Sequence, residues 1–142
     1  MKRNLISKLS LVLVILTMLS FISCDLRDQK TEPWDYAMYT EDTEFGEGAK
    51  TVQVKVVVKN DFVTFTIHTD ADTLGEALLE HGLIEGEDGQ FGMYIKKVNG
   101  IVADYDIDKS YWGFYQNGEY MMTGVDTTKI SGGEHFELVY EK

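Results

Sequence analysis

Three aspartates alternate with apolar residues in a short stretch whose carboxylate oxygens could coordinate a cation. Asp104, Asp106 and Asp108 have the spacing of the first ligands in a calcium-binding loop. Such a loop also needs a glycine at its sixth position and a glutamate at its twelfth, where this chain has Lys109 and Tyr115. The stretch therefore predicts a solvated acidic loop, with a weak cation site as the alternative.

Other residue types that commonly do chemistry are few or scattered. The three histidines, His68, His81 and His135, lie far apart, without the short ligand spacing that is typical of a zinc site. The chain has no Gly-x-Ser-x-Gly elbow, phosphate loop or dinucleotide fingerprint, and its many carboxylates single out no acid pair. We therefore predict that the protein is not an enzyme, has no metal site and requires no cofactor.

An aromatic segment is the most distinctive candidate for binding chemistry. Five of the ten residues at 111–120 are aromatic, and they flank Asn117-Gly118, a pair typical of a tight β-hairpin turn. In an extended strand, Trp112 and Phe114 share one face. Because aromatic residues dominate small cores, we predict that these two rings are buried, with ligand binding as the alternative role.

The other aromatic residues of this hairpin are predicted to face outward, together with the two methionines that follow it. Rigid aromatic surface beside adaptable thioethers suits a large flat or apolar partner. The predicted ligand-binding residues are Tyr111, Tyr115, Tyr120, Met121 and Met122.

The segments before this hairpin predict two strands and a helix. Valine recurs at every second position of 52–58, and Val63, Phe65 and Ile67 alternate with polar residues, as in an antiparallel hairpin with one buried face. Residues 73–76 then fit a capping box, which marks the start of a helix that we expect to end near Gly82.

The rest of the chain predicts further strands. Residues 94–98, 101–103 and 135–140 have strand patterns, whereas 85–89 is predicted to be a loop. Two strands, a helix and several more strands define an α+β domain. We expect a β-grasp (ubiquitin-like) arrangement, a mainly antiparallel sheet with one helix, over residues 50–142.

The N-terminal segment predicts export and a lipid anchor. Positive charges at 2–8 precede an apolar run at 9–22, as in a secretory signal, and the run is shorter than a spanning helix needs. The residues up to Cys24, the only cysteine, resemble a bacterial lipobox. We therefore expect a signal peptide at 1–23, lipidation of Cys24, and an extracytoplasmic protein held at the cell membrane by its acyl chains.

Residues 24–49 are predicted to form an acidic tether. They are rich in Asp and Glu and contain the only proline, and Trp34, Tyr36 and Tyr39 are interpreted as part of the tether, with docking on the domain as the alternative. Without its first 23 residues, the chain carries 24 acidic and 10 basic residues, a net charge of −14. Such a surface repels nucleic acid, so we expect no nucleic-acid partner.

Several of these segments, in this order, resemble the transcobalamin-like C-terminal domain family, which includes bacterial lipoproteins and surface proteins and is related to the small β domain of transcobalamin and intrinsic factor. The resemblance covers about residues 50–142. It is carried by 73–79, 92–95, 98–101, 111–115, 117–120 and Gly124-Val125.

This resemblance implies a β-grasp-like fold and possible corrinoid binding. In the vitamin carriers the domain closes over one side of cobalamin, and a large helical domain holds the other side. We therefore expect a lipid-anchored protein that captures cobalamin or another corrinoid and shares it with a transporter. The alternative is a cell-surface adhesion or interaction module that binds protein or polysaccharide.

Overall fold

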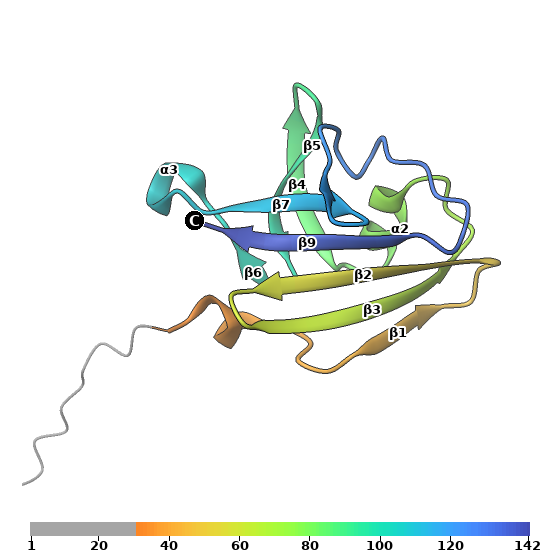
Figure 1. Cartoon of the computed structure of the whole chain (residues 1–142), viewed down its shortest axis with the longest axis horizontal. Helices are drawn as coiled ribbons and strands as arrows, with labels where there is room; N and C mark the ends of the chain where they lie inside the picture. Colours follow the sequence, from red (N-terminus) through yellow and green to blue (C-terminus); the bar gives the residue numbers. More distant parts are fainter. Residues whose placement is uncertain (1–30) are drawn as a thin grey trace, which may run out of the picture. The chain divides into compact units, whose positions relative to one another are not determined.

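Two β-sheets form the framework of the part of the chain that this computed structural model describes, residues 31–142 (Figure 1). The predictions for residues 1–23 and Cys24 lie outside the described residues. In spatial order, the larger sheet contains β1 (Thr43–Gly46), β3 (Asp61–Thr69), β2 (Lys50–Val58), β9 (His135–Glu141), β7 (Tyr111–Gln116) and β8 (Glu119–Tyr120). The smaller sheet contains β4 (Ile84–Gly89), β5 (Gly92–Val98) and β6 (Ile101–Val102).

The pairing within the larger sheet brings the first predicted hairpin beside the last strand. β2 pairs with β3 as an antiparallel hairpin, and its other edge pairs in parallel with β9. β9 in turn pairs antiparallel with β7, which carries the aromatic segment. The chain therefore has a β-rich α+β fold, with the aromatic strand two places away from β2.

Helices form a minor part of the described residues. The predicted helix is α2 (Leu74–Glu80), and both halves of its capping box are present between Thr73 and Glu76. The expectation of a single helix is corrected by a second short helix, α3 (Tyr105–Asp108), and by a 3-10 turn, η2 (Pro33–Tyr36). None of the helices described between residues 31 and 142 has the length and apolar run that crossing a bilayer requires.

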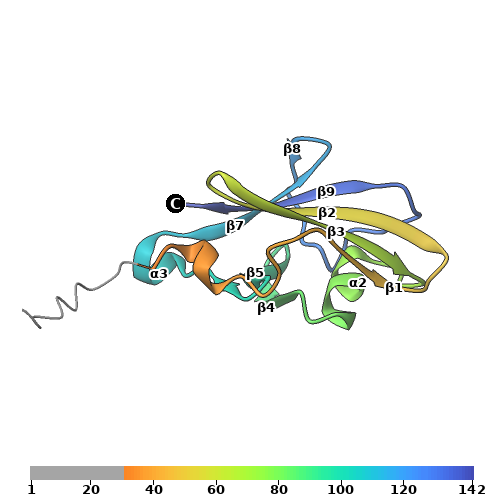
Figure 2. The same cartoon turned by 90° about the horizontal axis from the view of Figure 1, so that it is seen from below.

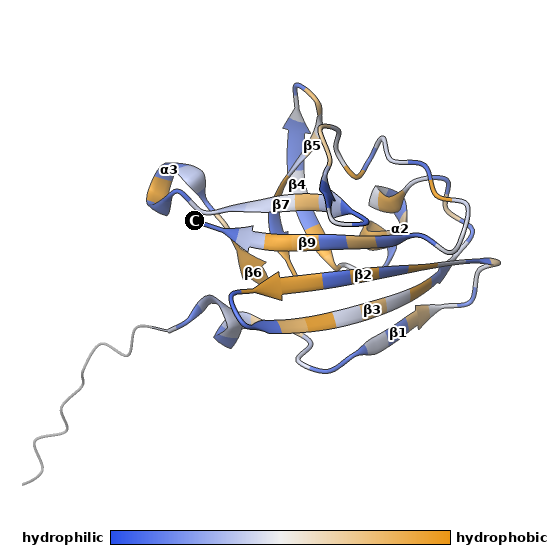
Figure 3. Ribbon diagram, in the orientation of Figure 1, coloured by the Kyte–Doolittle hydropathy of each residue, from blue (hydrophilic) through white to orange (hydrophobic). Residues whose placement is uncertain are grey.

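The core lies on one face of the larger sheet. β4, β5 and α2 pack on that side in Figure 2, and Figure 3 shows hydrophobic residues along β2, β3 and β9. The alternation predicted for β2 and β3 is confirmed, because every second residue of each strand is almost fully buried. These buried residues are Val52, Val54, Val56, Val58, Val63, Phe65 and Ile67.

Residues 32–49 belong to the compact unit, which corrects the prediction of a tether that extends to residue 49. Strand β1 in this segment pairs in parallel with β3. The ring of Tyr39 makes edge contacts with Phe45 and Phe65, and its backbone exchanges two hydrogen bonds with the buried side chain of Asn99. Aromatic packing and these long-range hydrogen bonds outweigh the acidic composition that favoured a tether.

The segment 85–89, predicted as a loop, is also a strand. It forms most of β4, which pairs antiparallel with β5. Its residues are polar or glycine and exposed, so the sequence lacks the alternation by which a strand is recognised. Backbone pairing with β5 supplies the order that the side chains do not indicate.

The acidic stretch forms the start and body of α3. The carboxylate of Asp104 accepts hydrogen bonds from the backbone N–H groups of Asp106 and Ile107 and so caps the helix. Hydrogen bonds from Ser110, together with Lys142, lower the pKa of Asp108 to about 2. Within residues 31–142, no three or more His, Cys, Asp and Glu side chains are grouped so that they could hold a metal ion.

Candidate ligand-binding site

A pocket of about 290 Å³ lies between the β4–β5 hairpin, strand β7 and the segment that follows β8. Most of its surface comes from aromatic rings, thioethers and glycine backbone. The lining residues are Gly89, Gln90, Phe91, Gly92, Met93, Tyr94, Ile95, Tyr111, Trp112, Phe114, Tyr120, Met121, Met122, Thr123, Gly124 and Val125.

Two buried aromatic rings contribute to this pocket while they also belong to the core. Trp112 is 7% exposed and Phe114 is 6% exposed. The indole N–H of Trp112 donates a hydrogen bond to the carbonyl of Ile101 at 3.3 Å, and its ring makes an edge contact with Tyr140. These contacts hold the indole in place, and the ring of Phe114 packs against that of Phe136, so the pocket has a rigid aromatic floor.

The outer parts of the pocket expose large apolar side chains to solvent. Phe91, at the tip of the β4–β5 hairpin, is 73% exposed, and Met122 on the opposite segment is 80% exposed. Met93 and Met121 lie deeper, where they pack against the core. Exposed apolar side chains next to a pocket are typical of a binding site, and flexible thioethers adapt to a ligand's shape.

Asp126 joins the two segments on which these exposed residues lie. Its Oδ1 accepts a hydrogen bond of 2.6 Å from the backbone N–H of Met93. The N–H of Gly124 donates to the carbonyl of Phe91 at 3.0 Å. The two contacts fix the tip of the β4–β5 hairpin against the segment 121–126, and we call them the Asp126 clamp.

Two glycines allow the backbones of the Asp126 clamp to approach closely. A Cβ atom on Gly124 would lie 2.4 Å from Asp126 Oδ1 and 2.6 Å from Met93 N. Gly92 has a φ of +110°, and a Cβ there would lie 2.9 Å from Gly124 N. Only glycine fits these positions without displacing the backbone across from it.

The start of α2 holds the other side of the segment 121–128. The N–H of Gly75 donates to the carbonyl of Val125 at 2.8 Å, and the N–H of Leu74 donates to the carbonyl of Thr128 at 2.9 Å. Both are N–H groups of the first helical turn, which have no partner inside the helix. The helix therefore positions the segment that carries Met121 and Met122.

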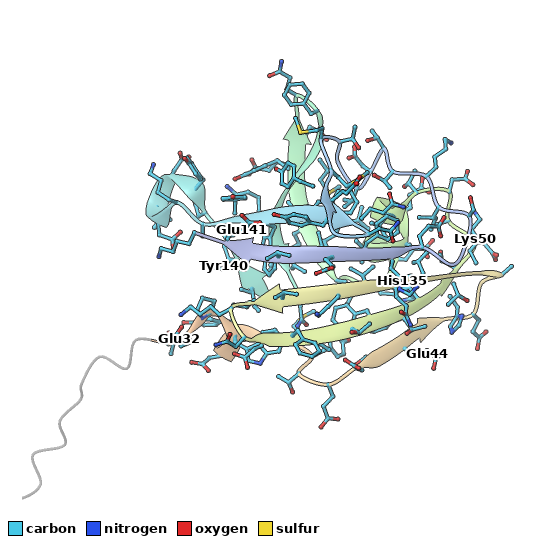
Figure 4. All side chains as sticks on the ribbon, viewed as in Figure 1. Glu32, Glu44, Lys50, His135, Tyr140 and Glu141 are labelled. Carbon is cyan, nitrogen blue, oxygen red and sulfur yellow. The ribbon has the colours of Figure 1, made fainter. Side chains whose placement is uncertain are left out.

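The tyrosine hydroxyls of β7 point to the outward face of the strand, as alternation predicts. The hydroxyl groups of Tyr111 and Tyr115 donate to the two oxygens of Glu141, the first at 2.7 Å. Figure 4 shows Glu141 near the end of β9, alongside β7. The hydrogen bond to Glu141, with burial, raises the pKa of Tyr115 to about 12.

The structure brings most of the predicted site residues together and leaves one outside. Six line the pocket: Tyr111, Trp112, Phe114, Tyr120, Met121 and Met122. Tyr115 does not line it.

Several residues of the site were not predicted from the sequence. Phe91, Met93 and Tyr94 line the pocket, and Asp126 holds its two sides together through a contact across 33 residues. In the local sequence, only the glycines at 89, 92 and 124 indicated that two backbone segments approach each other closely here.

Comparisons with known proteins place this fold in a class. The structure resembles haptocorrin in complex with Cbi, with a TM-score of 0.55, 20% identity, and coverage of 69% of this chain and 26% of that chain. It also resembles a protein from Ruminococcus gnavus ATCC 29149 that is described as a candidate metal-binding protein. That match has a TM-score of 0.61 and 34% identity and covers 66% of this chain and 97% of the other. The fold is therefore that of a transcobalamin-like domain.

The family follows from the sequence match. A family model described as a domain of unknown function (DUF4430) matches residues 71–142, which include α2, the whole pocket and the last strand. The chain belongs to this family. No curated protein matches it.

Proposed function

We propose that the protein captures an organic ligand through a flat or apolar face that enters the pocket, with cobalamin or another corrinoid as the leading candidate. The observation that carries this proposal is the rigid floor of Trp112 and Phe114 beneath exposed apolar side chains. An aromatic floor favours a ligand with a flat or apolar face. The similarity of the fold to haptocorrin, whose structure is described with Cbi, supports the choice of a corrinoid.

The size of the pocket limits how tightly a corrinoid is held. A volume of about 290 Å³ is at the low end for a small-molecule site, and a corrin macrocycle is much larger. The pocket therefore takes one edge or face of the ligand and leaves the rest accessible. A modest affinity of this kind suits a protein that passes the ligand to a transporter.

A metal ion is not the ligand that we propose for this pocket. None of its lining residues is His, Cys, Asp or Glu. The description of the Ruminococcus relative concerns that protein, and the lining here favours an organic ligand. The same lack of His, Cys, Asp and Glu in the lining supports a role in binding rather than catalysis.

Three further inferences complete the proposal. The order β3-β2-β9-β7, with a parallel central pair and α2 after the first hairpin, supports a β-grasp classification. The segments that resemble the transcobalamin-like family, between residues 73 and 125, support membership among the transcobalamin-like domains of bacterial lipoproteins. The sequence up to Cys24 supports lipid anchoring outside the cytoplasm. Labelling of cells with radioactive palmitate would test this anchoring, with Cys24→Ala as the control.

Titration of the full chain with cobalamin tests ligand capture. We expect quenching of Trp112 fluorescence and a shift in the corrin absorption spectrum, and Trp34→Phe removes the other tryptophan from the signal. An unchanged spectrum at high micromolar ligand would contradict the proposal.

Two matched methionine variants localise the binding to the pocket. Met122→Ala removes an exposed lining residue and is expected to weaken binding about three- to tenfold with little change in the melting temperature. Met38→Ala removes a methionine that is 54% exposed and does not line the pocket, so it should bind as the parent does. Trp112→Ala, in contrast, should destabilise the fold by about 3–5 kcal/mol.

A further inference from the structure

The face of the larger sheet that points away from the core carries a second set of aromatic and charged side chains. The smaller sheet and α2 pack on the other side of the larger sheet (Figure 2). Most residues on the outward face are therefore at least partly exposed. Phe62 on β3, for example, is 55% exposed. This face meets the pocket at Tyr111 and Tyr120, which also line the pocket, whereas Tyr115, Glu137 and Glu141 lie outside it.

An apolar row crosses the middle of this outward face. The strand register aligns Gly113 on β7 with Val139 on β9, Val139 with Val57 on β2, and Val57 with Phe62 on β3. Directly opposite residues in neighbouring strands share a face of the sheet. The four residues therefore form one stripe across four strands, which we call the apolar stripe.

Tyrosines and carboxylates flank the apolar stripe. On one side Tyr115 lies opposite Glu137 and its ring is 5.4 Å from that of Tyr120; on the other side Tyr111 lies opposite Glu141. The hydroxyls of both strand tyrosines converge on Glu141. A carboxylate has about four acceptor positions, so Glu141 can still accept from a partner.

Lys55, a positive charge on this face, contacts an aromatic ring. Lys55 lies opposite Glu137 in the register, but its Nζ sits 4.5 Å from the centroid of the Phe62 ring. Among the ion pairs found within residues 31–142, none involves Glu137 or Glu141. The carboxylates thus keep their negative charge available beside the tyrosine rings.

We propose that this outward face docks an arginine-bearing segment of a partner protein. Apolar side chains of the segment cover the apolar stripe, and its guanidinium groups pair with Glu137 and Glu141 while they stack on Tyr111, Tyr115 and Tyr120. A guanidinium matches a carboxylate in two-point geometry and stacks on aromatic faces, which a lysine ammonium does less well. The formal net charge of −11 steers a cationic segment toward the chain.

The choice of a protein segment over a glycan follows from the apolar stripe. A central apolar patch with a polar and charged rim is the usual anatomy of a protein interface, where tyrosine and arginine are enriched. A neutral glycan would leave both carboxylates without a charged partner. The proposal does not depend on what the pocket binds.

The test uses the full chain and a dye-labelled peptide of alternating arginine and leucine as the probe. We expect Glu137→Gln to weaken peptide binding about tenfold, as the loss of one charge-assisted contact predicts. Glu87→Gln, on β4 in the other sheet, removes the same charge from an exposed position and should change binding less than about twofold. A matched lysine–leucine peptide should bind several times more weakly than the arginine peptide.

Three results would overturn the proposal. Equal losses in Glu137→Gln and Glu87→Gln would show that net charge alone attracts the peptide. Equal binding of the arginine and lysine peptides would remove the role of the tyrosine rings. Lack of binding at low salt, or displacement of the peptide by a neutral oligosaccharide, would assign the surface to another partner. Cobalamin titration of the same variants should be unchanged, which separates this surface from the pocket.

Discussion

Gly124 is the residue at which the pocket is most sensitive to an added methyl group, because backbone and carboxylate atoms lie opposite its Cα. The contact atoms are Met93 N and Asp126 Oδ1, which themselves form the Asp126 clamp. Met93 N is a backbone atom, and its hydrogen bond to Oδ1 restrains the exposed carboxylate of Asp126. A larger residue must therefore open the clamp.

Gly124→Ala is expected to destabilise the protein by about 1–3 kcal/mol and to weaken ligand binding, because the new Cβ overlaps the Asp126 clamp. Urea unfolding measures the loss of stability, and faster amide hydrogen exchange at Met93 reports the opening of the clamp directly, without a ligand. Unchanged exchange at Met93 would contradict the role of the clamp.

Gly118→Ala provides the control for this substitution. Gly118 has a φ of +80°, and a Cβ added there would have no atom within 4 Å, so the new methyl costs about 1 kcal/mol of conformational strain only. Exchange at Met93 should then match the parent.

Tyr115 illustrates how one carboxylate changes the ionisation of its neighbours. Because its hydrogen bond to Glu141 raises the pKa from 10.0 to about 12, the protonated phenol stabilises the fold below pH 10. That contribution is lost as the pH rises from 10 to 12. The hydrogen bond to Glu141 also raises the pKa of Tyr111, so ultraviolet titration of phenolate should show late-ionising tyrosines, of which one disappears in Tyr115→Phe. Glu141→Gln should return the pKa of Tyr115 toward 10.0. A Tyr115 that ionises with the exposed tyrosines would refute the contact.

At the scale of elements, α2 is short, and its N-terminus both carries the capping box and binds the segment that follows β8. The helix has seven residues, and its first turn bonds both to its own capping box and to the segment that follows β8. Isolated helices of this length are unstable in water, so tertiary contacts must supply most of the stability. The capping box sets where the helix begins and hence where it meets Val125.

Thr73→Ala is expected to lower the free energy of unfolding by about 1 kcal/mol, because the N–H of Glu76 loses its side-chain acceptor. Thermal or urea unfolding gives the value. Thr73→Ser keeps a hydroxyl at this position and should stay within a few tenths of a kcal/mol of the parent. If both variants lose the same stability, the hydroxyl is not the cause.

At the scale of the whole molecule, Asn99 joins the segment 32–46 to the rest of the unit. Its amide donates to the carbonyl of Tyr39 at 2.8 Å and accepts from the N–H of Tyr39 at 2.9 Å. The residue is fully buried in a turn with a φ of +51°. One side chain therefore satisfies both backbone groups of a residue 60 positions away.

Asn99→Gly is expected to cost about 1–3 kcal/mol and to release the segment 32–46, because Tyr39 loses both hydrogen bonds while glycine keeps the turn geometry. Limited proteolysis should then cut within this segment first. Asn117→Gly is the matched control, since Asn117 has the same φ of +51° in an Asn-Gly turn but is exposed. Equal proteolysis of the two variants would contradict the role assigned to Asn99.

Local patterns were sufficient to predict most elements. The valines of β2, the capping box before α2 and the two Asn-Gly turns depend on neighbours in the sequence, and the structure confirms each of them. Strands β1 and β4 were missed because backbone pairing, rather than side-chain alternation, orders them: β1 pairs with the distant strand β3, and β4 forms a hairpin with β5. Phe91 and Asp126 were missed because the contacts between the tip of this hairpin and the segment 121–126 join residues far apart in the chain.

The sequence by itself determined that Trp112 and Phe114 face one way along β7 while Tyr111 and Tyr115 face the other, because side-chain alternation is a property of any extended strand. Only the tertiary structure decided what each face does. The β4–β5 tip and the segment 121–126 meet beside the buried rings through the Asp126 clamp, so the face predicted as core also lines the pocket. The register with β9 placed Glu137 and Glu141 beside the tyrosines. Such contacts join residues far apart in the chain, and no local pattern encodes them.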